Sequence, residues 1–374
     1  MIIRKNKLDS LQIDITARCQ AMCLECSRNI DGKELNPKIG SADSWDMPVE
    51  LFKKAVTPQM LENSLKKIMF NGNFGDPCIH PNFIEILEYV IEYSNGKCEM
   101  AISTNGAMFK PDYWSAIGKI LNKKSSPRSR IIFGIDGLQD THHIYRRNTR
   151  YEDVIANATA FINEGGNADW QYIIFDHNKH QVEEAKQVAK ELRFNDIYFK
   201  GEVNDDGGAR NYTKAVGKNE IDYGAKTKKN PEVSVSVKSR SGFVKAKEHV
   251  TKKLNEAKSL QKESLPFLDT AKITCQWYEA KSMYIEYDGT VWMCCWMGDM
   301  HKSKDPTMNK EYQFLANKFG HNFNNLNYHS FDDILSHEYF ADYLDKSFNS
   351  TRNDPNTPRS HTCAKTCVWG KTFI

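Results

Sequence analysis

The sequence is poor in cysteine for its length, lacks long apolar runs and carries almost no net charge. Its ten cysteines are spread over 374 residues, whereas secreted domains stabilised by disulfides have theirs densely placed. The N-terminal stretch MIIRKNKLDSLQIDI has neither the apolar core nor the cleavage site of a secretory signal. No apolar run reaches the length of a membrane span. We therefore expect a cytoplasmic protein with no membrane partner, in which thiols stay reduced and clustered cysteines hold metal.

The charge is nearly balanced, with 51 Lys and Arg against 48 Asp and Glu, which argues against a dedicated polyanion binder. Residues 226–263 depart from this balance, because they contain eleven basic and four acidic residues. Such a segment would serve nucleic-acid or nucleotide binding electrostatically. A solvated helix face is the alternative, since Phe243 is the only aromatic residue among these charges.

Six short apolar runs alternate with helix-like segments in the first 200 residues. The alternation predicts parallel βαβ units with right-handed crossovers, so that ligands would bind at the carboxyl ends of the strands. The fold class expected is α/β, a partial (β/α)6 TIM-like barrel followed by a small C-terminal α+β domain. The six predicted strands are residues 11–15, 66–70, 98–103, 130–136, 170–175 and 196–200.

The pattern changes near residue 205, where DDGGARN reads as a linker. Half of the cysteines lie in the last hundred residues, together with YIEYDGTVWMC, which predicts a hairpin turning at Asp288 and Gly289. We therefore predict a barrel over residues 1–205, a linker with a basic insertion over 206–267, and an auxiliary domain over 268–374.

The stretch CQAMCLEC places Cys19, Cys23 and Cys26 directly after the first predicted strand. A structural zinc site prefers four ligands, so three thiolates favour a metal site with one open position. On a [4Fe–4S] cluster, three thiolates leave one iron atom free for a substrate or cofactor. A zinc site or chance clustering is the alternative.

The Cys-x3-Cys-x2-Cys spacing after the first strand resembles that of the radical S-adenosylmethionine (SAM) superfamily. Two further stretches are similar to that family in the expected order. NGNFGDPCIHP resembles the Gly-Glu-Pro loop that binds the SAM amino group, with Asp in place of Glu, and STNG resembles the loop that binds the ribose or methionine end. The matching positions are Gly75, Asp76, Pro77, Ser103 and Asn105.

GIDGLQDTHHIYRR is similar to a stretch found in many peptide-modifying members of this superfamily. Its Arg146 matches an arginine that would bind the SAM carboxylate through a bidentate contact. Taken one at a time, STNG is equally typical of a turn and Arg146 of a surface charge. The resemblance rests on the order of the four motifs along the strand ends.

The C-terminal cysteines resemble the SPASM/twitch extension of the same superfamily. Cys275, Gly289 and Cys294 give Cys-x13-Gly-x4-Cys, and Cys363 and Cys367 follow near the end. A full SPASM domain binds two auxiliary clusters, but only five cysteines lie here, so the resemblance implies one auxiliary [4Fe–4S] cluster with four protein ligands. A four-cysteine zinc site is the alternative.

The sequence leaves the roles of two further cysteines undecided. Cys295 competes with Cys294 as a ligand, although the spacing favours Cys294. Cys78 follows Pro77 at the expected ligand rim, where it is either a buried small hydrophobe or a catalytic thiol. No catalytic acid, base or radical relay can be chosen from the sequence.

The resemblance implies an enzyme that cleaves SAM reductively to a 5′-deoxyadenosyl radical, which abstracts hydrogen from a substrate. The first function that we expect is that of an oxidoreductase acting on a ribosomal peptide or protein, with flavodoxin or ferredoxin as electron donor. Oxidation of a small molecule such as a sugar or aminocyclitol, and modification of a nucleotide or RNA, stay open. The non-enzyme alternative is an iron–sulfur electron carrier or sensor, which would not need the SAM-contact residues.

We predict two [4Fe–4S] clusters in the anaerobically reconstituted protein, because seven cysteines fall into sets of three and four. Analysis should find about eight iron and about eight sulfide per chain. Replacing Cys19, Cys23 and Cys26 by Ala should leave about half of each. Stoichiometric zinc with little iron would contradict this prediction.

Overall fold

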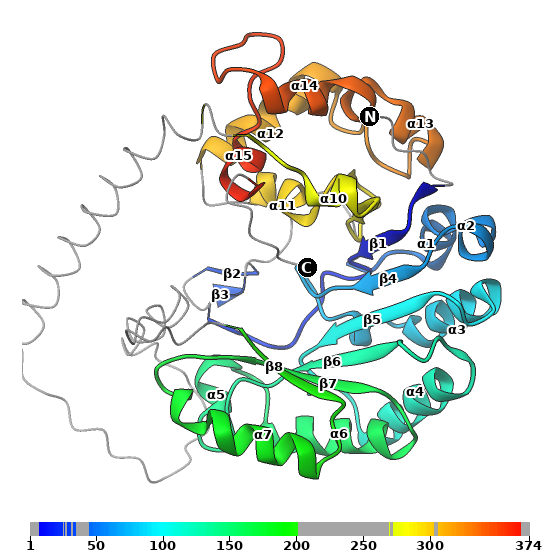
Figure 1. Ribbon diagram of the computed structural model, residues 1–374, viewed down its shortest axis with the longest axis vertical. Coiled ribbons are helices and arrows are strands. Elements are labelled where there is room, and N and C mark those ends of the chain that lie inside the picture. Colours follow the sequence, from blue (N-terminus) through cyan, green and yellow to red (C-terminus); the bar gives the residue numbers. More distant parts are fainter. Residues whose placement is uncertain are drawn as a thin grey trace, which may run out of the picture.

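The computed structural model describes residues 7–24, 26, 28–30, 33–34, 45–200, 269, 272–302 and 306–367. The predicted linker and basic insertion, residues 206–267, lie outside the described residues. Eight strands form one sheet in the order β10-β9-β1-β4-β5-β6-β7-β8 (Figure 1). Their bounds are β1 Ser10–Ile13, β4 Lys67–Phe70, β5 Glu99–Thr104, β6 Arg130–Gly134, β7 Ala168–Ile173, β8 Asp196–Lys200, β9 Ser282–Ile285 and β10 Val291–Trp292. A separate two-stranded ladder joins β2 Asn29–Ile30 to β3 Lys33–Glu34.

The expected α/β fold is confirmed. All six predicted strands are present, and they pair in parallel in chain order from β1 to β8. The sheet does not close, because β8 and β10 end the order among the described strands. This arrangement is a partial barrel of six parallel strands, the first five of which are each followed by helices among the described residues.

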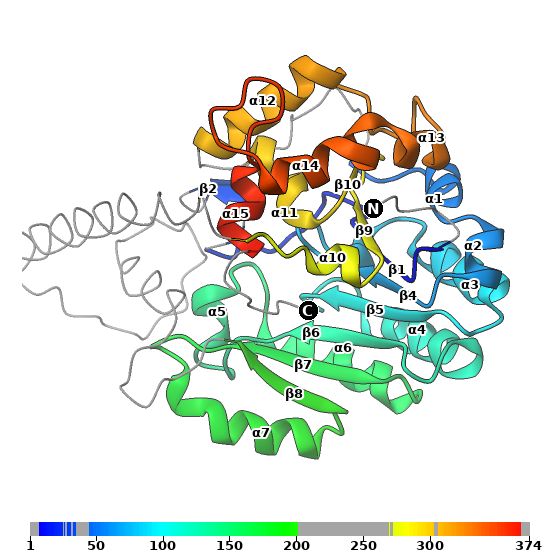
Figure 2. The ribbon, with the colours of Figure 1, turned by 45° about the horizontal axis from the view of Figure 1, so that its top comes forward.

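The helices divide into two groups (Figures 1 and 2). The longer helices between the barrel strands line the outer face of the sheet, whereas the short α5 lies at the strand ends and the helices after residue 272 lie beyond the β9 side. The first group is α1 Val49–Ala55, α2 Pro58–Asn63, η2 Pro77–Ile79, α3 Phe83–Ser94, α4 Pro111–Lys124, α5 His142–Tyr145, α6 Tyr151–Asn163, η3 Lys179–Gln181 and α7 Val182–Glu191. The second is α10 Gln276–Glu279, α11 Cys295–Gly298, η4 Asp299–Lys302, α12 Pro306–Phe319, α13 Phe331–Ser336, the π-helix η5 Tyr339–Tyr343, α14 Leu344–Asn349 and α15 His361–Cys367. None of the described helices is both long and apolar enough to cross a membrane.

Helix α3 illustrates how the outer layer forms. Its buried residues Phe83, Ile86, Leu87 and Val90 recur at helical spacing and belong to the core beneath the sheet. The helix ends where Asn95 takes a left-handed conformation with φ of 48° and its backbone N–H bonds to the last turn. The same sequence pattern that predicted this helix therefore also fixes the face that it buries.

The hairpin predicted at Asp288 and Gly289 is confirmed, and Gly289 adopts a φ of +86° that favours glycine. The sequence did not predict where the hairpin attaches. Strand β9 pairs in parallel with β1, and the Asp14 N–H donates to the Ile285 carbonyl at 3.0 Å. The buried hydroxyl of Tyr284 also donates to Asp14 Oδ2 at 2.8 Å. The C-terminal region thus extends the barrel sheet.

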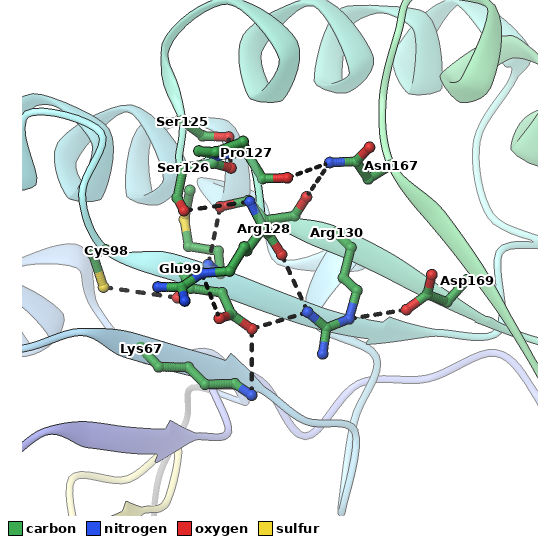
Figure 3. A network of polar contacts seen from close by, with 12 residues as sticks. Lys67, Cys98, Glu99, Ser125, Ser126, Pro127, Arg128, Arg130, Asn167 and Asp169 are labelled. Carbon is green, nitrogen blue, oxygen red and sulfur yellow. Dashed lines mark hydrogen bonds and ion pairs between the residues drawn. The ribbon is translucent and has the colours of Figure 1, made fainter. Parts of the chain in front are cut away.

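The inner face of the sheet carries a charged network at the amino-terminal ends of four neighbouring strands (Figure 3). Glu99 Oε1 lies 3.3 Å from Lys67 Nζ and 2.9 Å from Arg130 Nη1. Arg130 Nε lies 2.9 Å from Asp169 Oδ2, so the network crosses β4, β5, β6 and β7. It lies at the end opposite to the one where such folds bind ligands, which indicates a stabilising role.

We predict that Glu99→Gln lowers the free energy of unfolding by about 1–3 kcal/mol, because it weakens charge-assisted bonds to cations that are themselves largely shielded from water. Glu92→Gln, on the exposed side of α3, is the matched control and should change it by less than about 0.5 kcal/mol. Anaerobic urea unfolding measures both. Equal effects of the two substitutions would contradict a structural role for this network.

Candidate functional site

The loop after β1 carries the three N-terminal cysteines and is fixed by backbone contacts on both sides. The Ala17 N–H donates to the Trp45 carbonyl at 2.7 Å, and the Asp76 N–H donates to the Arg18 carbonyl at 2.7 Å. A Cβ atom on Gly75 would lie 2.0 Å from the Thr16 carbonyl oxygen. Only glycine therefore lets the loop after β4 pack directly against the cysteine loop.

The three thiols lie at an apolar wall. Cys23 is buried, Cys19 and Cys26 are partly buried, and all three pack with Tyr145 and Phe175 from the loops after β6 and β7. Burial raises the pKa of the Cys19 thiol to about 12 and that of Cys23 to about 11, and neighbouring thiolates add to both. The three groups are thus close enough to interact, and a bound metal would have to displace their protons.

The carboxylate of Asp76, which the sequence predicts to contact the SAM amino group, accepts hydrogen bonds from groups of the protein itself. Its carboxylate accepts from the Thr104 hydroxyl at 2.9 Å, from the Asn105 N–H at 2.8 Å and from Asn105 Nδ2 at 2.5 Å. It also accepts from the Cys78 N–H at 3.1 Å, just after Pro77 opens η2. Burial raises the pKa of Asp76, whereas these donors lower it. The aspartate therefore holds the ends of β4 and β5 together.

Asn105 extends this arrangement to the cysteine loop. Its side-chain Nδ2 lies 3.5 Å from Cys19 Sγ, and its Oδ1 accepts from Gln20 Nε2 at 2.6 Å. Ser103 lies two residues earlier on the inner face of β5, partly buried. Its side chain makes none of the hydrogen bonds found among the described residues of this group. The structure brings together Asp76 and Asn105, with Ser103 nearby along the strand.

Arg146 lies beside the same loop but is paired within the protein. Its Nε bonds to Asp136 Oδ2 at 2.6 Å, and its Nη1 lies 3.9 Å from Cys23 Sγ. The other oxygen of Asp136 accepts from the Ile173 N–H at 2.6 Å. A Cβ on Gly134 would lie 2.5 Å from Arg146 Nη2. The sequence analysis missed the roles of Gly134 and Asp136, although both lie in its GIDG stretch.

The four C-terminal cysteines come from three segments that are distant in the sequence. Cys275 precedes α10, Cys294 precedes α11, and Cys363 and Cys367 lie one turn apart on α15. Burial raises the pKa of Cys275 to about 11, and the charge of Cys367 contributes to that shift. Burial also raises the pKa of Cys294, to which the charges of Cys295, Cys363 and Cys275 contribute. Burial likewise raises the pKa of Cys363, and the charges of Glu311, Cys275 and Cys367 add to that shift. The fold therefore brings the four cysteines into one group, in which Cys275, Cys294 and Cys363 are buried and Cys367 is partly buried.

Cys295 and Cys78 do not belong to either set. Burial raises the pKa of Cys295 to about 12, and the next causes are the charges of Asp299 and Asp14, which places this thiol toward β1. Cys78 is completely buried and its carbonyl accepts from the Tyr113 hydroxyl at 2.7 Å. The charge of Cys295 also raises the pKa of the neighbouring Cys294, and the choice of Cys294 as the ligand stays a prediction.

Two buried tyrosines flank the four-cysteine group without a hydrogen-bond partner for their hydroxyls. They are Tyr278 on α10, three residues after Cys275, and Tyr339 on η5. Buried hydroxyls are nearly always satisfied, and cluster sulfides accept hydrogen bonds. The residues present thus fit an iron–sulfur cluster. Within the described ranges no three His, Cys, Asp or Glu surround a single metal ion; a cluster needs no such arrangement, because each thiolate binds a different iron atom.

Comparison with known proteins identifies the C-terminal region. Residues 275–367 match the SPASM family model, an iron-sulfur cluster-binding domain. The auxiliary iron–sulfur domain expected from the cysteine spacing is therefore confirmed. A search of curated proteins found no match.

Solved structures with a similar fold include Streptococcus suis SuiB bound to S-adenosylmethionine, at 14% identity and a TM-score of 0.49, over 96% of this chain and 77% of that one. Native anSMEcpe with bound AdoMet and Cp18Cys peptide has 14% identity and a TM-score of 0.49, over 96% and 88%. Likenesses this distant do not carry function from one chain to another.

We predict that Arg146→Ala lowers the free energy of unfolding by about 3–5 kcal/mol, because it leaves the fully buried carboxylate of Asp136 unpaired. Adding Asp136→Asn should recover part of that loss. Arg150→Ala, at a side chain 74% exposed, is the control and should cost less than about 1 kcal/mol. Anaerobic urea unfolding of the two single variants and the double variant measures these changes. If the losses of unfolding free energy from Arg146→Ala and Asp136→Asn simply add in the double variant, the ion pair between the two residues is contradicted.

Proposed function

We propose that this chain, which carries a SPASM iron–sulfur cluster-binding domain over residues 275–367, is a radical SAM enzyme. The observation that carries the proposal is that two separate cysteine groups converge beside one sheet: three thiols after β1 and four around β10, α10, α11 and α15. When bound, the first cluster and SAM would supply a 5′-deoxyadenosyl radical that abstracts hydrogen. The residues of the chain bind, orient and shield these groups.

In this proposal Cys19, Cys23 and Cys26 hold the first cluster and leave one iron atom for SAM. Gly75 and Pro77 shape the loop that approaches the cysteine loop, and Ser103 faces the ligand from β5. Asp76 contributes to SAM binding mainly by fixing Asn105, since its carboxylate already accepts four protein donors.

Arg146 supplies a buried positive charge beside Cys23. Its ion pair with Asp136 fixes one edge of the guanidinium, so that Nη1 faces the cysteine loop. A carboxylate such as that of SAM would be attracted to this position. The apolar wall of Tyr145 and Phe175 excludes water on the same side.

The second group, Cys275, Cys294, Cys363 and Cys367, would hold one auxiliary [4Fe–4S] cluster with no open iron position. Such a cluster does not bind substrate, so we assign it to electron relay. An electron acceptor beside the substrate suits a net oxidation, and this supports an oxidoreductase with flavodoxin or ferredoxin as donor. The boundaries 1–205, 206–267 and 268–374 are part of the same proposal.

The substrate we propose is a ribosomal peptide or protein, on the likeness of GIDGLQDTHHIYRR to peptide-modifying members. The inner face between the two cysteine groups is polar, which suits a substrate with polar groups. Gln12 and Asp14 of the β1 segment lie beside Tyr284 and Glu286 of the β9 segment, and all four are buried. The charge of Asp14 reaches Cys295, next to the ligand Cys294.

The test is SAM cleavage by the reconstituted full chain with dithionite as reductant. The unchanged protein should form 5′-deoxyadenosine and methionine, and Cys363→Ala/Cys367→Ala should retain cleavage, because the three-cysteine site is intact. Cys19→Ala/Cys23→Ala/Cys26→Ala should abolish it. Cys98→Ala, at a buried thiol outside both groups, is the control for loss of a cysteine.

Chromatography of the products and circular dichroism of each variant complete the measurement, since metal binding couples to folding. Cleavage that persists in the triple variant would contradict the assignment of the first site. Absence of cleavage by the unchanged protein carrying both clusters would overturn the proposed function.

A further inference from the structure

The hydroxyls of Tyr278 and Tyr339 are buried, unpartnered and close to the four-cysteine group. Tyr339 is 0% exposed and Tyr278 is 7% exposed, and neither Oη has a hydrogen-bond partner. A hydroxyl that is buried without a hydrogen-bond partner destabilises the folded protein, because it has lost its hydrogen bonds to water. Two such hydroxyls in one small region are therefore unfavourable unless a neighbouring group accepts hydrogen bonds from them.

The rings around these tyrosines offer no such acceptor. Tyr339 packs edge-on against Trp292, Phe323 and Phe340, with ring centroids 6.1, 5.2 and 4.8 Å away. Tyr278 meets Phe348 edge-on at 6.3 Å. These contacts fix both rings by their edges and faces while leaving the hydroxyl groups unused.

The charges that act on these hydroxyls come from thiols of the cysteine group and from the carboxylates of Glu311 and Asp345. Glu311 already accepts hydrogen bonds from the Ser360 hydroxyl at 2.6 Å and from the Thr362 N–H and hydroxyl at 2.9 and 2.7 Å. Burial is the main cause that raises the pKa of Tyr339, followed by the charges of Cys363, Glu311 and Cys294. Burial likewise raises the pKa of Tyr278, and Cys275 follows as the second cause. The two hydroxyls thus flank the cysteine group from two different elements, α10 and η5.

We propose that Tyr278 and Tyr339 donate hydrogen bonds to the sulfur atoms of the auxiliary cluster and thereby raise its reduction potential. The inference rests on the proposed function, because it needs a cluster at Cys275, Cys294, Cys363 and Cys367. One-electron reduction adds a negative charge to the cluster, and a donor directed at its sulfur atoms stabilises that charge. The hydroxyls would make this cluster a better acceptor for the electron released in a net oxidation.

The experiment uses the full chain carrying Cys19→Ala, Cys23→Ala and Cys26→Ala, so that only the auxiliary cluster contributes to the spectrum. Redox titration followed by electron paramagnetic resonance gives its midpoint potential. Tyr278→Phe and Tyr339→Phe should each lower the equilibrium constant for reduction by about tenfold, which is about 59 mV for one electron. The double variant should shift further in the same direction.

Tyr343→Phe is the matched control. Tyr343 lies in the same helix and stacks on Tyr339 at 6.0 Å, but the charges that raise its pKa after burial are those of Glu311 and Asp354. Its removal should leave the potential unchanged. A general packing effect would instead move the potential in all three variants.

Pulsed electron paramagnetic resonance in D₂O provides the second measurement. The reduced cluster of the parent protein should show coupling to exchangeable deuterons, and Tyr278→Phe and Tyr339→Phe should each remove part of it. If a tyrosine variant fails to retain the cluster, the spectrum of the parent protein still tests the proposal. A parent spectrum without coupled deuterons would overturn it. Unchanged potentials with full iron and sulfide would also overturn it, whereas a parent protein without iron would overturn the proposed function instead.

Discussion

The parallel pairing of β1 with two partners is the constraint on which the rest of the structure depends. Residues 10–13 bond to β4 on one side and to β9 on the other, so this short strand lies inside the sheet. The loop that leaves β1 carries the three-cysteine group, and the hairpin that follows β9 leads to Cys294. Cys294 follows β10, which runs antiparallel to β9, and Cys275 lies shortly before β9, so both come toward the amino-terminal end of β9, whereas the three-cysteine loop leaves the carboxyl-terminal end of β1. The pairing of β1 with β9 therefore fixes the relative position of the two cysteine groups.

Buried charges around the first group are satisfied within the protein. Asp136 pairs with Arg146, and Asp76 accepts from Thr104 and Asn105. Leaving a charge buried without such partners would cost several kcal/mol, so each pair is formed before any ligand binds. The consequence is a preorganised site, in which the Asn105 amide and the Arg146 guanidinium are presented by groups behind them.

Much of the fold could be predicted because local patterns carry it. The six barrel strands, helix α3 and the turn at Gly289 follow from apolar spacing and from glycine conformation. The attachment of β9 to β1 could not be predicted, because strand partners such as Ser10 and Ser282, 272 positions apart, leave no local signal. Residues 206–267 lie outside the described residues, so their predicted basic role stays a prediction.

The sequence by itself predicted the two cysteine groupings and the order of the loops at the strand ends, because the three N-terminal cysteines are close together in the sequence and the C-terminal ones resemble a known pattern. Only the tertiary structure showed that Asp76 and Arg146 are paired within the protein: Asp76 accepts from residues at the end of the neighbouring strand β5, and Arg146 bonds to Asp136 in the folded segment after β6. The tertiary structure also places Cys295 toward Asp14, and it buries the Tyr278 and Tyr339 hydroxyls without hydrogen-bond partners near the four-cysteine group. Side-chain direction and burial depend on packing across elements, which no stretch of sequence specifies alone.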